Sequence, residues 1–130
     1  MSKPQGKPGR LELPHRWRWA DWSGRQVTQN NWETLGETLN AKLWQRMGAI
    51  VAARDSGRPL AKELCFFDKG IGKAKVKKPS PGVRLWFFQD GADYCVSQIT
   101  WKDEAKGEHS DQISIGLQAK AEQRERMGQI

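Results

Sequence analysis

The sequence has no long apolar run that would indicate a membrane protein. No apolar stretch approaches the ~20 residues that a helix needs to cross a bilayer, and the mean hydropathy is −0.79. The basic N-terminus is not followed by an apolar segment, so the sequence predicts neither a membrane anchor nor a signal peptide. We therefore expect a cytoplasmic protein.

Cysteine and histidine are also scarce, with two of each in the chain. Cys65 and Cys95 are far apart and outside any C-x-x-C spacing. Such residues are typical of reduced core thiols in a cytoplasmic protein. Because no pair of cysteines or histidines has ligand spacing, a structural zinc site is not expected. The sequence thus predicts no metal and no cofactor.

Positive charge is what the chain has in excess, and it is concentrated in two segments. Residues 1–30 and residues 61–82 each carry six Lys or Arg against two acids, whereas residues 83–130 carry six against eight. Concentrated positive charge suits a polyanion such as nucleic acid, with affinity that falls steeply as salt rises. A solvated basic face that only keeps the protein soluble is the alternative.

The length of 130 residues gives room for a single domain with one modest core. Residues 1–13, with proline and glycine among charges, are expected to form a flexible basic arm, and residues 14–130 the domain. Trp17 and Trp19 alternate with arginines, which is the period of a half-buried strand. We expect a first edge strand here, although interleaved Arg and Trp can also stack on bases.

A hairpin over residues 83–101 organises the rest of the chain. Asp90-Gly91, which favours a tight turn, lies between two apolar runs, and the first run, Leu85 to Phe88, is apolar throughout, as in a strand covered on both faces. Strict alternation in the second run predicts Tyr94, Val96 and Thr100 on one face and Cys95, Ile99 and Trp101 on the other. We expect Leu85, Phe87, Val96 and Ile99 to be buried.

Helices are expected on both sides of this hairpin in the sequence. An apolar stripe at spacings of three and four predicts a long helix over residues 32–54, capped by Asn30 or Asn31; its members are Trp32, Leu35, Leu39, Leu43, Met47 and Ile50. A final helix capped by Ser110 is expected to bury Ile113, Leu117 and Ala121, with residues 122–130 exposed and frayed. The fold class is therefore α+β, with a small antiparallel sheet of three to four strands packed against a long N-terminal helix and a C-terminal helix.

Between the long helix and the hairpin, residues 60–67 are expected to form a short element that packs Leu64, Phe66 and Phe67 inward. The basic connector that follows, residues 68–82, contains Gly72-Lys73 but not the first glycine or the Ser/Thr of a P-loop. Lysines alternating with apolar residues instead predict a strand with a basic outward face, and Pro79 to Gly82 predict a turn. The predicted nucleic-acid contacts are Lys73, Lys75, Lys77 and Lys78.

The order strand, long helix, short element, three strands, helix resembles the RelE/HigB-like toxins of bacterial toxin–antitoxin pairs over about residues 32–124. The residues that carry the resemblance are the basic strand Lys73 to Lys77, the Arg-led strand Val83 to Phe88, the pair Trp101-Lys102 and the helix positions Ser110, Ile113 and Ala119.

The resemblance implies a small α+β domain that enters the ribosomal A site and cuts messenger RNA in a basic cleft without a metal ion. It also implies RNA or the ribosome as partner, together with an antitoxin protein. By position, Lys75 and Lys77 match the family's basic second strand, Arg84 the arginine that opens the third, and Lys102 the first of two paired lysines. Arg84 and Lys102 are the predicted catalytic residues, and the hairpin is expected to bring them to one cleft.

The sequence departs from the family pattern at two points. Asp103 replaces the second paired lysine, and the final helix ends without the Tyr or His of some relatives. Asp103 or His109 are then the candidate bases, although the charged surroundings of His109 predict a solvated surface side chain.

A non-enzymatic binder is the rival interpretation. It would be either a gyrase-poisoning relative of the same fold or a phage or mobile-element inhibitor that docks on nucleic acid or protein. The seven tryptophans favour either contact surfaces or an aromatic core.

Overall fold

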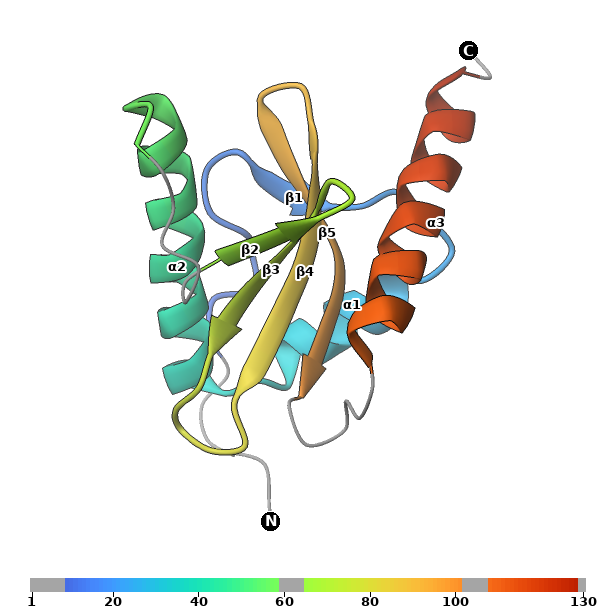
Figure 1. Cartoon of the computed structure of the whole chain (residues 1–130). Coiled ribbons are helices and arrows are strands. Elements are labelled where there is room, and N and C mark those ends of the chain that lie inside the picture. Colours follow the sequence, from blue (N-terminus) through green and yellow to red (C-terminus); the bar gives the residue numbers. More distant parts are fainter. Residues whose placement is uncertain (1–8, 59–64, 102–107, 129–130) are drawn as a thin grey trace.

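The computed structural model describes residues 9–58, 65–101 and 108–128. The elements in chain order are β1 (Trp17–Trp19), α1 (Arg25–Glu33), α2 (Glu37–Asp55), β2 (Cys65–Asp68), β3 (Ile71–Val76), β4 (Val83–Asp90), β5 (Asp93–Trp101) and α3 (Glu108–Gly128). One sheet in the order β1-β5-β4-β3-β2 contains the five strands. Figure 1 shows α2 and α3 on opposite sides of this sheet. The predicted α+β class is confirmed.

The predicted number of strands, three to four, was too low, because both edges carry a short additional strand. At one edge the expected Trp17–Trp19 strand pairs with β5, but it runs parallel to it, so the sheet is mixed. At the other edge β2 pairs with the start of β3. We expected Phe67 in β2 to be buried, but it is 44% exposed. β2 is the edge strand of the sheet and has a neighbouring strand, β3, on one side only, so Phe67 is open to solvent on the other. Leu64 lies outside the described residues.

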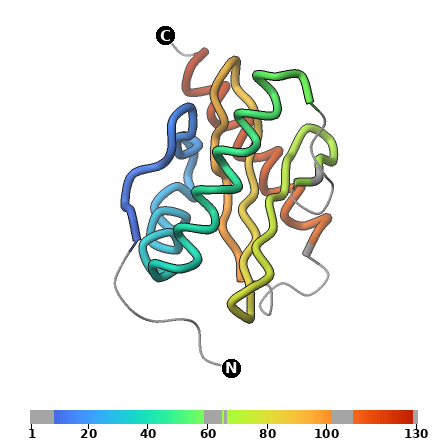
Figure 2. The backbone as a smooth tube through the Cα atoms, turned by 90° about the vertical axis from the view of Figure 1, so that its left-hand side faces the viewer, coloured from blue at the N-terminus to red at the C-terminus, as the bar shows by residue number. Residues whose placement is uncertain are grey.

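The larger core lies between the sheet and α2, which crosses in front of the strands in the view of Figure 2. Leu85, Phe87, Val96 and Ile99 are all buried there, as the sequence predicts. A smaller core lies on the opposite face, where Trp86, Phe88 and Cys95 pack with Ile113 and Ala119 of α3. The apolar run Leu85 to Phe88 is therefore covered on both faces.

A β-bulge changes the predicted alternation of β5. Phe87 pairs with Val96, whereas the preceding Trp86 pairs with Gln98, so Ser97 has no partner of its own. The extra residue reverses the alternation beyond it. As a result Ile99 and Trp101 join Tyr94 and Val96 on the α2 side of the sheet, as shown by their common core, and the prediction of opposite faces was wrong.

The long helix begins later than predicted. Gly36, with φ +86°, separates α1 from α2, and non-glycine residues rarely adopt such a φ. Trp32 and Leu35 therefore belong to α1 and the link, while Leu39 and the later stripe residues are buried by α2 as expected. Asn30 and Asn31 lie within α1 and not at the start of the long helix.

The last helix is longer than expected and buries a different face. It begins at Glu108, so Ser110 is not its cap, and it continues to Gly128. Ile113, Ala119 and Gln123 are buried, and Gly116 packs against Ile71 of β3. By contrast Leu117 is 39% exposed and Ala121 is exposed. None of the helices in the described ranges has an apolar stretch long enough to cross a membrane.

Candidate functional site

The register of β3 and β4 brings two of the predicted basic residues together. Lys75 lies directly opposite Arg84, and two residues further along each strand Lys73 lies opposite Trp86. Because side chains alternate along a strand, and Trp86 packs on the α3 side of the sheet, these four residues share that face. Like charges directly opposite one another repel, so an anion placed between Lys75 and Arg84 would be stabilised by both.

The end of this strand pair forms a small hollow of about 190 Å³, which is lined by Lys75, Val76, Lys77, Val83 and Arg84. Three of its five lining residues are cations. The hollow is thus electrostatically suited to a phosphate group, because Arg and Lys bind phosphate through charge-assisted hydrogen bonds.

Lys73 has a different environment from the other lysines. Only 9% of Lys73 is exposed, although the sequence predicts an outward basic side chain. Its Nζ lies 3.0 Å from Nδ1 of His109 and 5.2 Å from the centre of the Trp86 ring. The hydrogen bond and the cation–π contact explain how an ammonium group can be this deeply buried.

His109 connects Lys73 to a carboxylate. Its Nε2 lies 2.9 Å from Oδ2 of Asp68, and the two side chains are 37% and 38% exposed respectively. Since an ammonium group can only donate, a neutral imidazole with its proton on Nε2 satisfies both contacts: it donates to Asp68 and accepts from Lys73. The imidazole ring also lies 5.9 Å from the Trp86 ring, which forms the floor of the site.

Three separate elements position this line of side chains. Asp68 ends β2, and the turn at Lys69 and Gly70, both with positive φ, reverses the chain into β3. His109 lies in the first turn of α3. The contact of Gly116 with Ile71 holds α3 against β3, so its first turn lies beside Lys73.

The sequence predicts a solvated surface side chain at His109. In the structure the side chain is half-buried and is hydrogen-bonded through both ring nitrogens. Asp68 was not among the predicted site residues at all. Lys102 and Asp103 lie outside the described residues, so the pairing of Arg84 with Lys102 stays a prediction.

The tryptophans and cysteines have structural roles in the described part of the chain. Trp17, Trp22, Trp32, Trp86 and Trp101 are buried, which favours the aromatic core over exposed binding anchors.

Burial raises the pKa of Cys65 to about 12 and also raises that of Cys95, so neither thiol is suited to nucleophilic chemistry. Among the residues that the structure describes, no three His, Cys, Asp or Glu side chains gather as a metal site would require.

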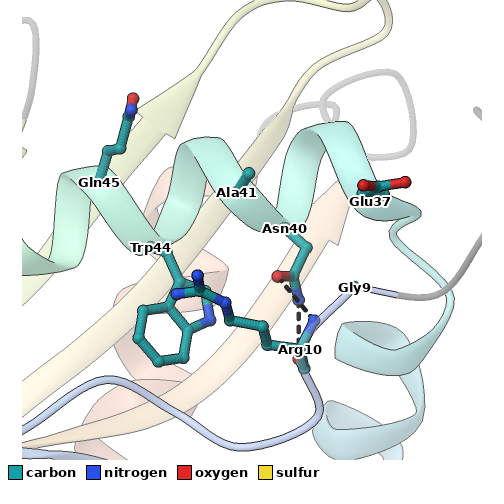
Figure 3. A pocket seen from close by; sticks show the side chains of 7 residues that line it. All are labelled: Gly9, Arg10, Glu37, Asn40, Ala41, Trp44 and Gln45. Carbon is teal, nitrogen blue, oxygen red and sulfur yellow. Dashed lines mark hydrogen bonds between the residues drawn. The ribbon is translucent and has the colours of Figure 1, made fainter.

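A separate hollow of about 650 Å³ lies between α2 and the segment that precedes β1, lined by Gly9, Arg10, Glu37, Asn40, Ala41, Trp44 and Gln45 (Figure 3). The Arg10 guanidinium lies 4.4 Å above the Trp44 ring, and the Asn40 side chain bonds both the backbone N–H and the carbonyl of Arg10. Arg10, which the composition assigns to the flexible basic arm, is thus held against α2 here. Because its arginine is stacked and its other charged group is a carboxylate, this hollow is less suited to phosphate than the sheet face.

Comparison of the chain with family models, curated proteins and solved structures found no match.

Proposed function

We propose that this protein is a metal-independent endoribonuclease of the RelE/HigB-like toxin type. One observation carries the proposal: the hydrogen-bonded line Asp68–His109–Lys73 lies beside the cations Lys75 and Arg84, since Lys73 is two residues from Lys75 on the same face of β3. An acid–base group beside two phosphate-binding groups is what RNA cleavage through the 2′-hydroxyl requires.

In the reaction the RNA 2′ oxygen forms a bond to the adjacent phosphorus, and the bond from phosphorus to the 5′ oxygen breaks. The 2′-hydroxyl proton passes to Nδ1 of His109, and the departing 5′ oxygen takes a proton from water. The products are a 2′,3′-cyclic phosphate and a 5′-hydroxyl end. The attacking group belongs to the substrate, so the reaction itself needs no metal-bound water.

Lys73 controls when His109 can act as a base. In the free protein its ammonium group donates to Nδ1, which occupies the lone pair that would accept the proton. A bound phosphodiester offers this ammonium group a charged acceptor, and charge-assisted hydrogen bonds are stronger than neutral ones. Lys73 then turns toward the phosphate, and Nδ1 becomes available to the 2′-hydroxyl. Substrate binding and activation of the base are thereby coupled.

Lys75 and Arg84 stabilise the negative charge that develops on the phosphorane oxygens. Strand pairing fixes their backbone positions, and preorganised charged groups typically contribute ~10²–10³ in rate. Asp68 is a positioning residue, because it orients the imidazole and holds the proton on Nε2. The ribosome and an antitoxin protein enter the proposal from the family resemblance alone.

The test is cleavage of single-stranded RNA by the purified protein, with and without ribosomes and in the presence of EDTA. We expect cleavage that EDTA does not abolish and 2′,3′-cyclic phosphate ends. His109→Gln should lower the rate ~10²–10⁴-fold, as loss of a general base does. Arg84→Gln should lower it ~10²–10³-fold. The melting temperature of each variant, compared with the assay temperature, shows that the variant is still folded where its activity is measured.

His15→Gln is the matched control, because His15 is the chain's other histidine and is exposed; its activity should equal that of the original protein. If His109→Gln and Arg84→Gln both keep full activity, the nuclease proposal is wrong. The same conclusion follows if the purified protein leaves RNA intact both with and without ribosomes, and the non-enzymatic binder then takes its place.

A further inference from the structure

We propose that the protein holds a longer stretch of single-stranded RNA than the cleavage site alone requires, in a basic groove between α2 and the end of β3. This inference rests on the proposed function for the identity of the ligand. The groove is lined by Lys42, Gln45, Arg46, Ala49, Lys75, Val76, Lys77 and Lys78 and has a volume of about 610 Å³.

One wall of the groove is a single helix face. Lys42, Gln45, Arg46 and Ala49 are spaced by three, one and three residues, so they form one continuous stripe on α2. This stripe is separate from the buried stripe of Leu39, Leu43 and Met47 that holds the helix on the sheet. Lys42 and Arg46 were not predicted as binding residues, because the sequence alone does not place α2 beside the end of β3.

The groove collects positive charge, since five of its eight lining residues are Lys or Arg and none is an acid. Lys42 Nζ donates a hydrogen bond of 2.7 Å to the backbone carbonyl of Lys78, which ties the helix to the segment after β3. An ammonium group has three donors, so this bond leaves Lys42 with two further hydrogens for an anion. The arrangement is typical of a surface that tracks a phosphate backbone.

The groove and the small hollow of the cleavage site share a wall. Lys75, Val76 and Lys77 line both. Lys75 and Arg84 lie on the α3 side of the sheet and α2 on the other, but β2 pairs with β3 only as far as Ala74. A nucleic-acid strand that places one phosphate between Lys75 and Arg84 would therefore pass around this edge of β3, which β2 does not cover, to reach Lys42 and Arg46.

The composition of the groove favours RNA over a protein segment. Protein interfaces usually depend on apolar or aromatic anchors in dry pockets, and here the only apolar side chains are Ala49 and Val76. Trp86, the nearest large aromatic on the cleavage face, is fully buried and cannot stack on a base. Binding should thus depend on phosphates, with little sequence preference.

The test measures binding of 2′-O-methyl oligonucleotides to the full chain across a salt series. These oligonucleotides keep the phosphates but lack the attacking hydroxyl, so cleavage does not interfere. One probe is about twelve nucleotides long, within the range of typical single-strand sites, and the other about three. The groove variant is Lys42→Gln with Arg46→Gln. The control variant, Arg25→Gln with Arg124→Gln, removes the same charge from exposed positions on α1 and α3.

For the longer probe, the groove variant should reduce the slope of log K against log salt by about 1.4, at ~0.7 for each phosphate that is no longer neutralised. The control variant should leave this slope unchanged, and the two variants should bind the short probe alike. Equal slopes for the groove and control variants would overturn the inference. So would a loss of affinity for an acidic peptide but not for the oligonucleotide, because the groove would then be a protein site.

The two proposals fail separately. If the groove variant behaves as expected but RNA is never cleaved, the binding groove stands and the nuclease does not. If short RNA is cleaved but the groove variant leaves the salt slope unchanged, the nuclease proposal stands and the binding groove does not.

Discussion

Replacing Gly48 by alanine should stabilise the protein, whereas replacing Gly116 by alanine should not. Gly48 lies inside α2, and a Cβ added there would meet no atom within 4 Å. Gly116 lies inside α3, where a Cβ would come within 2.9–3.1 Å of three side-chain carbons of Ile71, a fully buried residue of β3. The chemical change is the same, so the difference between the variants reports on the packing of α3.

The magnitudes follow from two opposing terms. Alanine is favoured over glycine in a helix interior by about 1 kcal/mol, so Gly48→Ala should stabilise the protein by about that amount. Overpacking a filled core costs about 1–3 kcal/mol, so Gly116→Ala should change stability by between about 0 and −2 kcal/mol. At about 4 °C per kcal/mol for a chain of this size, Gly48→Ala should raise the melting temperature by about 4 °C.

Urea unfolding followed by tryptophan fluorescence, with thermal melts as a second measure, gives both values. Equal slopes of unfolding free energy against urea in the two variants would show that only stability has changed. If Gly116→Ala stabilises the protein as much as Gly48→Ala, α3 does not pack on Ile71. The explanation for the position of His109 would then be wrong.

Two further predictions concern the core. Leu43→Ala should lower the free energy of unfolding by ~2–5 kcal/mol, since Leu43 is fully buried between α2, to which it belongs, and the sheet; a loss below about 0.5 kcal/mol would contradict its place in the core. Burial raises the pKa of Cys65 from 9.0 to about 12, so its thiol should react with a thiol reagent at pH 8 only after unfolding in urea. Because the unfolded chain loses that proton more readily, stability should also fall as pH rises from 9 toward 12, and by less in Cys65→Ala.

The sequence predicts best those parts of the fold that depend on local patterns. Asp90-Gly91 and its flanking apolar runs predict a hairpin between two neighbouring strands. The spacing of Leu39 and Leu43 predicts one buried face of a single helix. Both patterns lie within a short stretch of sequence. The bulge at Ser97 has no such signal, because one inserted residue leaves the composition of β5 unchanged. Its consequence is large, since every later side chain of that strand changes face.

The break at Gly36 shows a different limit. The apolar stripe continues through this residue, because Trp32 and Leu35 bury their side chains in the same core as α2. Periodicity alone therefore predicts one helix. A glycine inside a stripe is either tolerated at a cost of about 1 kcal/mol or used for a positive φ, and only the backbone geometry distinguishes the two.

The two halves of the candidate site differ in the same way. Lys75 and Arg84 meet through the register of adjacent strands, so their proximity follows from a basic strand that pairs with the Arg-led strand after it. His109 meets Asp68 and Lys73 across 41 and 36 residues of sequence, and this meeting depends on how α3 packs on the sheet. Neither composition nor spacing near His109 carries that information.

In the proposed enzyme, phosphate binding and proton transfer depend on different elements of the fold. The phosphate-binding pair belongs to the sheet, whereas the proposed base is carried by α3 and held in place partly through Gly116. A change that shifts α3 without unfolding the sheet should therefore weaken the contacts of His109 while Lys75 and Arg84 stay opposite one another. Gly116→Ala is such a change, so we expect it to lose RNA cleavage but to bind the 2′-O-methyl oligonucleotide as the original protein does. Equal losses of binding and cleavage would mean that both halves of the site depend on α3.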